Sequence, residues 1–314
     1  MRVVFRGSPP FATPILKRLL EGPHEVLGLV TPPDRPRGRG RKVVRSPLVE
    51  VALANGVEVV QPTTTKDDAF VERLGAFGAD ALAVASYGEI LRTNVLELCP
   101  HGALNVHASL LPRWRGASPI QRAIAAGDAE TGVTIQRMVL ALDAGPVAVT
   151  RRTPIGERET AADLFERLSI LGADALVEAL DRIEAGDASF EPQDEGAVTL
   201  APKLRKADGV VDFSRSSADV DRHVRAMTTW PGARTTLPDG RDLVVLEARP
   251  AEGSLGAEDS GALPGTVLDE ASFAVRSGDG AVQLRRVKPA GKGAMDGDAF
   301  LRGARIARGE RLGG

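Results

Sequence analysis

The sequence predicts an α/β protein. An N-terminal, doubly wound and mainly parallel Rossmann-like sheet is followed by a C-terminal OB-like β-barrel. Two observations carry this prediction. Short apolar runs alternate with longer amphipathic runs as far as about residue 185, which is typical of βαβ units. After about Asp208 the chain changes to short strands separated by turns, as in a small barrel. The expected domains are 1–187 and 208–314, with a linker at 188–207.

Each element of the first domain follows from its residue pattern. Apolar runs predict strands at 3–5, 26–30, 57–60, 81–85 and 103–107. Amphipathic runs between and after them predict helices at 13–20, 47–55, 67–77 and 119–126. The segments 132–138 and 147–153 flank a turn at Asp143 and predict a hairpin. Thr160 and Asp163 resemble a capping box that opens a long helix, which Gly186 can end.

The bulk composition excludes several classes of protein. A chain of 314 residues is long enough for two domains, and 43% hydrophobic with 26% charged residues is ordinary for a soluble protein. No apolar run is long enough to span a membrane, and the first is too short for a signal peptide. The single cysteine, Cys99, excludes an internal disulfide and indicates a reducing compartment. One cysteine and four histidines argue against a closed zinc site, so no metal is expected.

The loop after the first strand reads Gly7-Ser8-Pro9-Pro10-Phe11. A dinucleotide-binding loop needs three spaced glycines so that the backbone can approach a pyrophosphate. This loop has one, which argues against a nicotinamide enzyme. A tight strand-to-helix turn and the lining of a ligand cleft both remain open for it.

Two polar side chains lie in the last part of the fifth predicted strand, 103–107. Because alternate residues of a strand point the same way, Asn105 and His107 face one side of it. Asp143 lies on a turn that could fold back onto the imidazole. The three side chains fit acyl transfer to an amine: the amide stabilises an oxyanion, the imidazole takes a proton and the carboxylate orients the ring. The other histidines are interpreted as structural: His24, His101 and His223.

Basic side chains gather in two places. Residues 32–45 hold six basic residues and one acid, with Pro and Gly that disfavour a helix. Phosphate binding and a plain solvated loop both remain open for this segment. Residues 276–311 hold nine basic and four acidic residues, a net +5 that suits nucleic-acid backbone or a solvated face equally. Because 33 of the 40 basic residues are arginine, Arg-rich runs are less informative in this chain.

Taken in order, several segments resemble the methionyl-tRNA formyltransferase family over the whole chain. The longest reads Asn-Val-His-Ala-Ser-Leu-Leu-Pro-Arg-Trp-Arg-Gly at 105–116. The others lie at 3–11, 33–40, 86–91, 130–135, 142–145, 201–204 and 289–295. Arg6 and Pro10 depart from the apolar and acidic residues usual near the first turn. Neither departure removes a catalytic group.

The resemblance implies formyl transfer from 10-formyltetrahydrofolate to the α-amine of methionine on initiator tRNA. It implies catalytic roles for Asn105, His107 and Asp143. It implies folate binding by Ser109, Leu110, Leu111 and Pro112, and by Tyr87, Gly88, Ile90 and Leu91. It places these basic residues against the tRNA acceptor end: Arg35, Arg37, Arg39, Arg41 and Lys42. The C-terminal domain would hold the tRNA, and we expect a cytoplasmic monomer without a membrane partner.

Two other functions are compatible with parts of the pattern. A formyltransferase acting on a nucleotide sugar or another small amine would share the catalytic trio. The basic loop and the C-terminal domain argue against it, because a small amine needs neither. A non-catalytic RNA-binding protein on an enzyme scaffold would not need the intact set of Asn105, His107 and Asp143.

Overall fold

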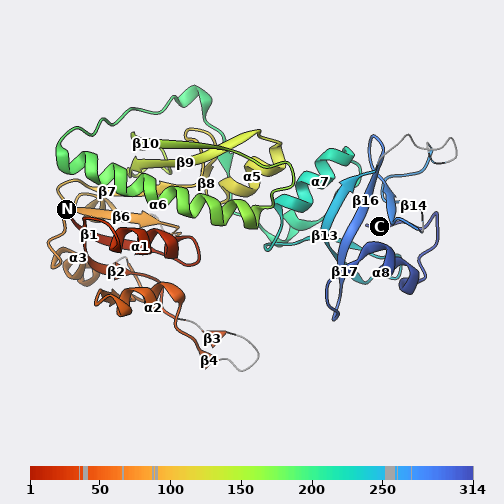
Figure 1. Cartoon of the computed structure of the whole chain (residues 1–314), viewed down its shortest axis with the longest axis horizontal. Helices are drawn as coiled ribbons and strands as arrows, with labels where there is room; N and C mark the ends of the chain where they lie inside the picture. Colours follow the sequence, from red (N-terminus) through yellow and green to blue (C-terminus); the bar gives the residue numbers. More distant parts are fainter. Residues whose placement is uncertain are drawn as a thin grey trace. The chain divides into compact units, whose positions relative to one another are not determined.

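A computed structural model describes residues 1–34, 36–37, 42–65, 67–86, 88, 91–251, 259, 261–269 and 271–313. The chain divides into two compact units (Figure 1). The first unit comprises Met1–Pro119, Glu130–Pro154 and Phe165–Pro202. The second unit comprises Ile120–Ala129, Ile155–Leu164 and Lys203–Gly314. None of the helices in the described part of the chain has the length and apolar character needed to cross a membrane.

A seven-stranded sheet forms the centre of the first unit, in the order β10-β9-β7-β6-β1-β2-β5. The strands are β1 (Arg2–Gly7), β2 (Glu25–Val30), β5 (Glu58–Val60), β6 (Ala81–Ala85), β7 (Ala103–His107), β9 (Glu130–Arg137) and β10 (Val147–Pro154). The five strands from β7 to β5 are parallel, while β9 and β10 are antiparallel at one edge. All residues of β6 are buried, as expected for a strand covered on both faces.

Helices cover both faces of this sheet. On one face, Phe11 at the start of α1 (Ala12–Leu20) and Phe165 of α6 (Ala161–Ala185) meet edge to face. Gly172 of α6 approaches Val106 so closely that a Cβ would lie 2.7 Å from its side chain. On the other face, α3 (Asp68–Gly75) and α4 (Thr93–Leu96) contribute to the core that contains Val4 and Val84. The arrangement is the doubly wound one that the alternating pattern predicts.

The remaining elements of the first unit are short. They are α2 (Pro47–Ala54), the β3–β4 hairpin (Pro36–Arg37 with Lys42–Val43), the parallel pair β8 and β11 (Arg115–Gly116 with Leu200–Ala201), and a 3₁₀ turn at Glu195–Ala197. Glu191 also exchanges backbone hydrogen bonds with Val147 at the start of β10. The stretch from about 191 to 201 is therefore hydrogen-bonded to the seven-stranded sheet and its loops.

The second unit is built on an antiparallel sheet in the order β12-β13-β16-β15-β14, with β17 paired to β16. Its strands are β12 (Ala233–Thr236), β13 (Asp242–Pro250), β14 (Val267–Asp269), β15 (Ala274–Arg276), β16 (Ala281–Pro289) and β17 (Met295–Asp296). Its helices are α7 (Ser217–Ala226), α8 (Gly297–Ala304), a 3₁₀ turn at Lys206–Gly209 and most of α5 (Pro119–Ala126). The predicted order, an α/β sheet followed by an antiparallel β domain, is confirmed.

Candidate active site

The candidate site forms where β7 ends at the carboxyl edge of the parallel sheet. Asn105 and His107, two residues apart on β7, both reach Asp143 on the turn between β9 and β10. The Asp143 Oδ1 atom lies 3.5 Å from Asn105 Nδ2 and 3.6 Å from His107 Nδ1. The structure thus brings together the three residues that the sequence singled out. Ligand sites in open α/β sheets occur at this edge.

The Asp143 carboxylate also accepts two hydrogen bonds from other groups. Gly116 donates its backbone N–H to Oδ2 at 2.9 Å, and Gln136 donates Nε2 to Oδ1 at 3.0 Å. Gln136 is almost fully buried on β9, directly opposite Asn105 in the sheet register. Each carboxylate oxygen therefore has a fixed donor, and the group is held in one orientation toward the imidazole.

The His107 ring is held at both of its nitrogens. Nε2 lies 2.9 Å from the Trp114 carbonyl oxygen, which can only accept, so Nε2 carries a hydrogen. Nδ1 faces the Asp143 carboxylate, which also only accepts when ionised. The Trp114 carbonyl oxygen and the Asp143 carboxylate thus fix the orientation of the His107 ring.

The segment that follows β7 is folded tightly against β9. Ser109, fully buried, donates its hydroxyl to the Arg113 carbonyl oxygen at 2.6 Å. Thr134 of β9 donates to the Ser109 carbonyl at 2.7 Å and accepts from the Leu111 N–H at 3.1 Å. Leu110, Leu111 and Pro112 remain half-buried, with a cis peptide bond before Pro112. In this segment the serine side chain supports the backbone, whereas the next three residues have surface left for a ligand.

Other predicted site residues are only partly described. Gly88 is exposed and Leu91 is buried, while Tyr87 and Ile90 lie outside the described residues. Of the basic loop, Arg37 ends β3 and Lys42 begins β4, with only their backbone described. Arg35, Arg39 and Arg41 lie outside the described residues.

Several residues at the site are missing from the sequence-based prediction. Thr134 and Gln136 are polar residues two apart on a strand, so the alternation that selected Asn105 and His107 could have found them as well. Gln193 donates Nε2 to the carbonyl oxygens of Asp143 and Gly145, at 2.8 and 2.7 Å. Gln193 lies 50 residues beyond Asp143 in a stretch without periodicity, and no sequence signal points to it.

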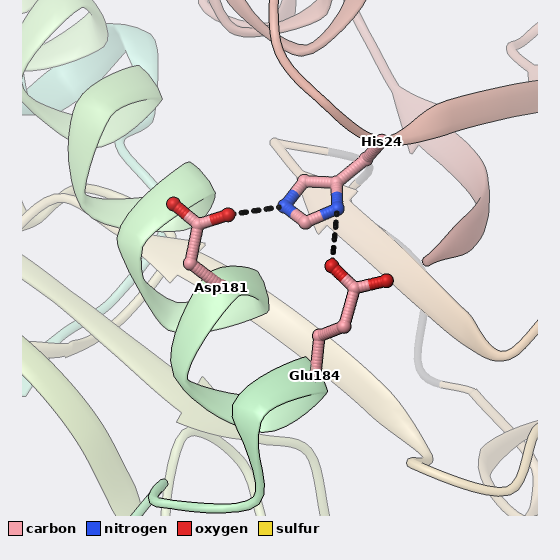
Figure 2. A group of neighbouring side chains, drawn as sticks. All are labelled: His24, Asp181 and Glu184. Atoms are coloured by element: carbon pink, nitrogen blue, oxygen red, sulfur yellow. Dashed lines mark ion pairs between the residues drawn. The ribbon is translucent and has the colours of Figure 1, made fainter.

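One group of side chains in the described part of the chain has the composition of a metal site: His24, Asp181 and Glu184 (Figure 2). Asp181 faces His24 Nε2 at 3.2 Å, and Glu184 faces Nδ1 at 3.8 Å. The two carboxylates thus lie at different nitrogens of one ring, as Figure 2 shows. The nearest group to Nδ1 is the Met1 ammonium, at 3.2 Å, and this ammonium also binds Glu184 at 2.5 Å. The group is therefore better described as a cluster of ion pairs that includes the N-terminus than as a metal site. The group ties α6 to the loop before β2.

Comparisons with known proteins agree over the whole chain. Residues 1–180 match the family described as "Formyl transferase", and residues 203–305 match "Formyl transferase, C-terminal domain". A methionyl-tRNA formyltransferase of Symbiobacterium thermophilum is 44% identical over 315 residues, covering 99% of this chain and 95% of the relative.

Two solved structures share the fold at lower identity. WlaRD, a sugar 3N-formyl transferase, has a TM-score of 0.68 at 16% identity, covering 93% of this chain and 98% of its own. HypX from Aquifex aeolicus in complex with tetrahydrofolic acid has a TM-score of 0.61 at 22% identity, covering 96% of this chain and 47% of its own.

Proposed function

The chain belongs to the formyl transferase family, among the methionyl-tRNA formyltransferases, and from this premise we propose its reaction. The formyl group of 10-formyltetrahydrofolate passes to the α-amine of methionine on initiator tRNA, in support of translation initiation. The observation that carries the proposal is the convergence of Asn105 and His107 on the Asp143 carboxylate at the edge of the sheet. An amide, an imidazole and a carboxylate at one point are the groups that amine acylation requires.

The proposed chemistry is a direct attack without a covalent enzyme intermediate. The amine nitrogen bonds to the formyl carbon, and the formyl oxygen becomes an oxyanion that accepts a hydrogen bond from Asn105. His107 takes the proton that the attacking nitrogen loses. The tetrahedral species collapses when the oxyanion re-forms the carbonyl, the bond from carbon to the folate N10 breaks, and His107 returns its proton to N10. An oxyanion donor of this kind contributes roughly 3–4 kcal/mol. Asp143 orients the imidazole by facing Nδ1.

The substrates are assigned to different parts of the chain. The half-buried surface of Leu110, Leu111 and Pro112 would bind the folate, with the 87–91 segment as its neighbour. The basic loop, with Arg35, Arg37, Arg39, Arg41 and Lys42, would meet the tRNA acceptor end. We retain 1–187 and 208–314 as the catalytic and tRNA-binding domains. Of the proposed linker 188–207, the stretch from about 191 to 201 is hydrogen-bonded to the first unit. The proposal is for a monomer acting in the cytoplasm, where initiator tRNA is charged and used.

A formylation assay tests the substrate. Purified protein is supplied with 10-formyltetrahydrofolate and either methionyl initiator tRNA, a nucleotide-linked amino sugar, or no amine. Formyl-methionyl-tRNA should form, and the amino sugar should not react. Formylation of the sugar alone would replace the proposal by the sugar-transferase alternative. No reaction with either amine would support a non-catalytic RNA-binding protein.

Two substitutions test the catalytic assignment. His107→Asn and Asp143→Asn should each lower kcat at least ~100-fold, within the range for loss of a general base. His101→Asn and Asp187→Asn serve as matched controls, because both side chains lie outside the site. Near-normal turnover in both site variants, with an unchanged unfolding transition, would exclude the assignment.

A further inference from the structure

We propose that Gln193 is a positioning residue that fixes the turn carrying the Asp143 carboxylate. The inference rests on the proposed function, since it assigns Gln193 a part in the same reaction. Gln193 touches the Asp143 backbone, whereas Gln136 touches the carboxylate itself. Its effect on the reaction would therefore pass through Asp143.

The Gln193 amide donates both of its hydrogens to carbonyl groups of this turn. A primary amide nitrogen has two N–H donors. Nε2 lies 2.8 Å from the Asp143 carbonyl oxygen and 2.7 Å from the Gly145 carbonyl oxygen. Two carbonyl groups that would otherwise need solvent are thereby bound to one side chain. The same nitrogen is 3.4 Å from Gln136 Oε1, so the two glutamines that hold the turn also meet each other.

The other end of the amide is held by a charged pair. Arg115 donates Nε and Nη2 to Gln193 Oε1, at 3.1 and 2.9 Å. The Arg115 side chain is buried and is itself bound by Glu195, at 2.7 Å from Nη2 and 3.1 Å from Nη1. Reversing the amide would place its oxygen against two carbonyl oxygens and its N–H groups against a guanidinium. The hydrogen-bond network thus fixes which way the amide points.

The turn that carries Asp143 is strained and tightly packed, and therefore needs such support. Asp143 has φ of +50°, in the left-handed region that costs a residue with a Cβ free energy. Gly145 packs so tightly that a Cβ would lie 1.7 Å from the Arg137 carbonyl oxygen. Gln136 binds the turn through the Asp143 carboxylate and the Gly145 N–H, at 3.0 and 3.1 Å. Gln193 holds its carbonyl groups, so the two side chains fix complementary groups of one strained turn.

Two variants separate the amide donors from the rest of the side chain. Gln193→Glu keeps the length and the acceptor for Arg115 but removes both donors. Gln193→Ala removes the whole side chain. Each should lower kcat about 10- to 100-fold, as removal of a supporting hydrogen bond does at other sites. KM for the folate and for methionyl-tRNA should change less than about 3-fold, because Gln193 acts on the turn and not on either substrate. Gln121→Ala, a half-buried glutamine of α5, is the matched control.

A double-mutant cycle with Asp143→Asn decides whether Gln193 acts through Asp143. In that background Gln193→Glu should cost less than about 2-fold more, because contacting residues that act together are not additive. A full additional loss, or a wild-type kcat in folded Gln193→Glu, would overturn the positioning role. If Asp143→Asn itself leaves turnover near normal, the proposed catalytic assignment fails, and with it this inference. Thermal unfolding identifies a Gln193 variant that does not fold. In that case the double-mutant cycle is measured with the other Gln193 variant.

Discussion

Gly116 shows how one residue can meet several demands at once. Its φ of +125° lies in a region that favours glycine. A Cβ at this position would lie 2.6 Å from the Ala201 carbonyl oxygen, which belongs to the neighbouring strand β11. Its N–H is one of the two fixed donors to the Asp143 carboxylate. The identity of this residue therefore affects backbone strain, strand pairing and the orientation of the carboxylate together.

We expect Gly116→Ala to lower both stability and turnover. The strained φ and the contact with backbone should cost about 1–3 kcal/mol of the free energy of unfolding. Displacement of the N–H should lower kcat about 10-fold or more. Denaturant unfolding and steady-state kinetics measure the two effects.

Gly303→Ala is the control, because Gly303 lies in α8 and a Cβ there would meet none of the described atoms within 4 Å. It should stabilise the helix by about 0.5–1 kcal/mol without changing kcat. Equal behaviour of the two variants would contradict the account of Gly116.

For individual residues, the sequence predicts part of the site. Strand alternation places Asn105 and His107 on one face, and both do contact Asp143. Alternation cannot find Gln193, because its role depends on where the chain returns after α6. Nor does it show that the Ser109 hydroxyl is turned inward onto the Arg113 carbonyl. Such contacts depend on tertiary geometry that no local pattern encodes.

Among the elements, α7 carries a buried histidine. Burial lowers the pKa of His223 below its ordinary value, and a hydrogen bond with the Gly209 backbone opposes the shift in part. The neutral ring is therefore favoured in the folded protein. Between the folded and unfolded pKa values the unfolded chain binds more protons, so stability rises with pH there. The contribution is complete above about 6.5, the unfolded pKa, and is lost as pH falls toward the lower folded value.

Replacing His223 by Gln should remove this part of the pH dependence. The free energy of unfolding of the wild type should fall more steeply between about pH 7.5 and pH 5.5 than that of the variant, because only the wild type must keep this ring neutral. Urea unfolding at each pH measures the difference. His101→Gln is the control, since His101 is only half-buried and lies outside α7. Parallel pH profiles for the wild type and His223→Gln would refute the expectation.

Elements with strong periodicity are the ones that the sequence predicts best. The strands at 81–85 and 103–107 and the helix at 119–126 coincide with β6, β7 and α5. The long helix begins after Thr160, which exchanges hydrogen bonds with Asp163 as the capping pattern predicts. We expect only short strands after about Asp208, because turn signals are frequent there, so the helices α7 and α8 are not predicted. The reciprocal pair Ser216 and Asp219 is a capping signal that could have located α7.

For the whole molecule, we expect surface charge to contribute to the binding of a tRNA substrate. The chain as a whole is slightly acidic, at −2, yet β16 exposes Arg285, Arg286 and Lys288. The backbone phosphates of a tRNA acceptor stem would bind such side chains. A folate has no phosphate and would not bind them in this way. The affinities for the two substrates should thus respond differently to ionic strength.

We expect KM for methionyl-tRNA to rise steeply with salt and KM for the folate to change little. Replacing Arg285, Arg286 and Lys288 by Gln should lower the slope of log KM against log salt by up to about 3, about 1 for each phosphate that is no longer neutralised. Lys17→Gln, an exposed lysine of α1, is the matched control. A salt-independent KM for the tRNA would contradict backbone recognition.

The hydrogen bonds from Gln193 to the Asp143 turn have a consequence for the order in which the protein becomes active during synthesis. Asn105 and His107 on β7, and Asp143 on the turn between β9 and β10, leave the ribosome well before Gln193 and the β11 residues that pair with β8. A nascent chain that has emerged only as far as residue 180 already holds every strand of the seven-stranded sheet, but the carbonyl groups of its carboxylate turn have no partner from the 191–201 stretch. Formylating capacity would thus mature only after the last part of the first unit has been translated and has folded back.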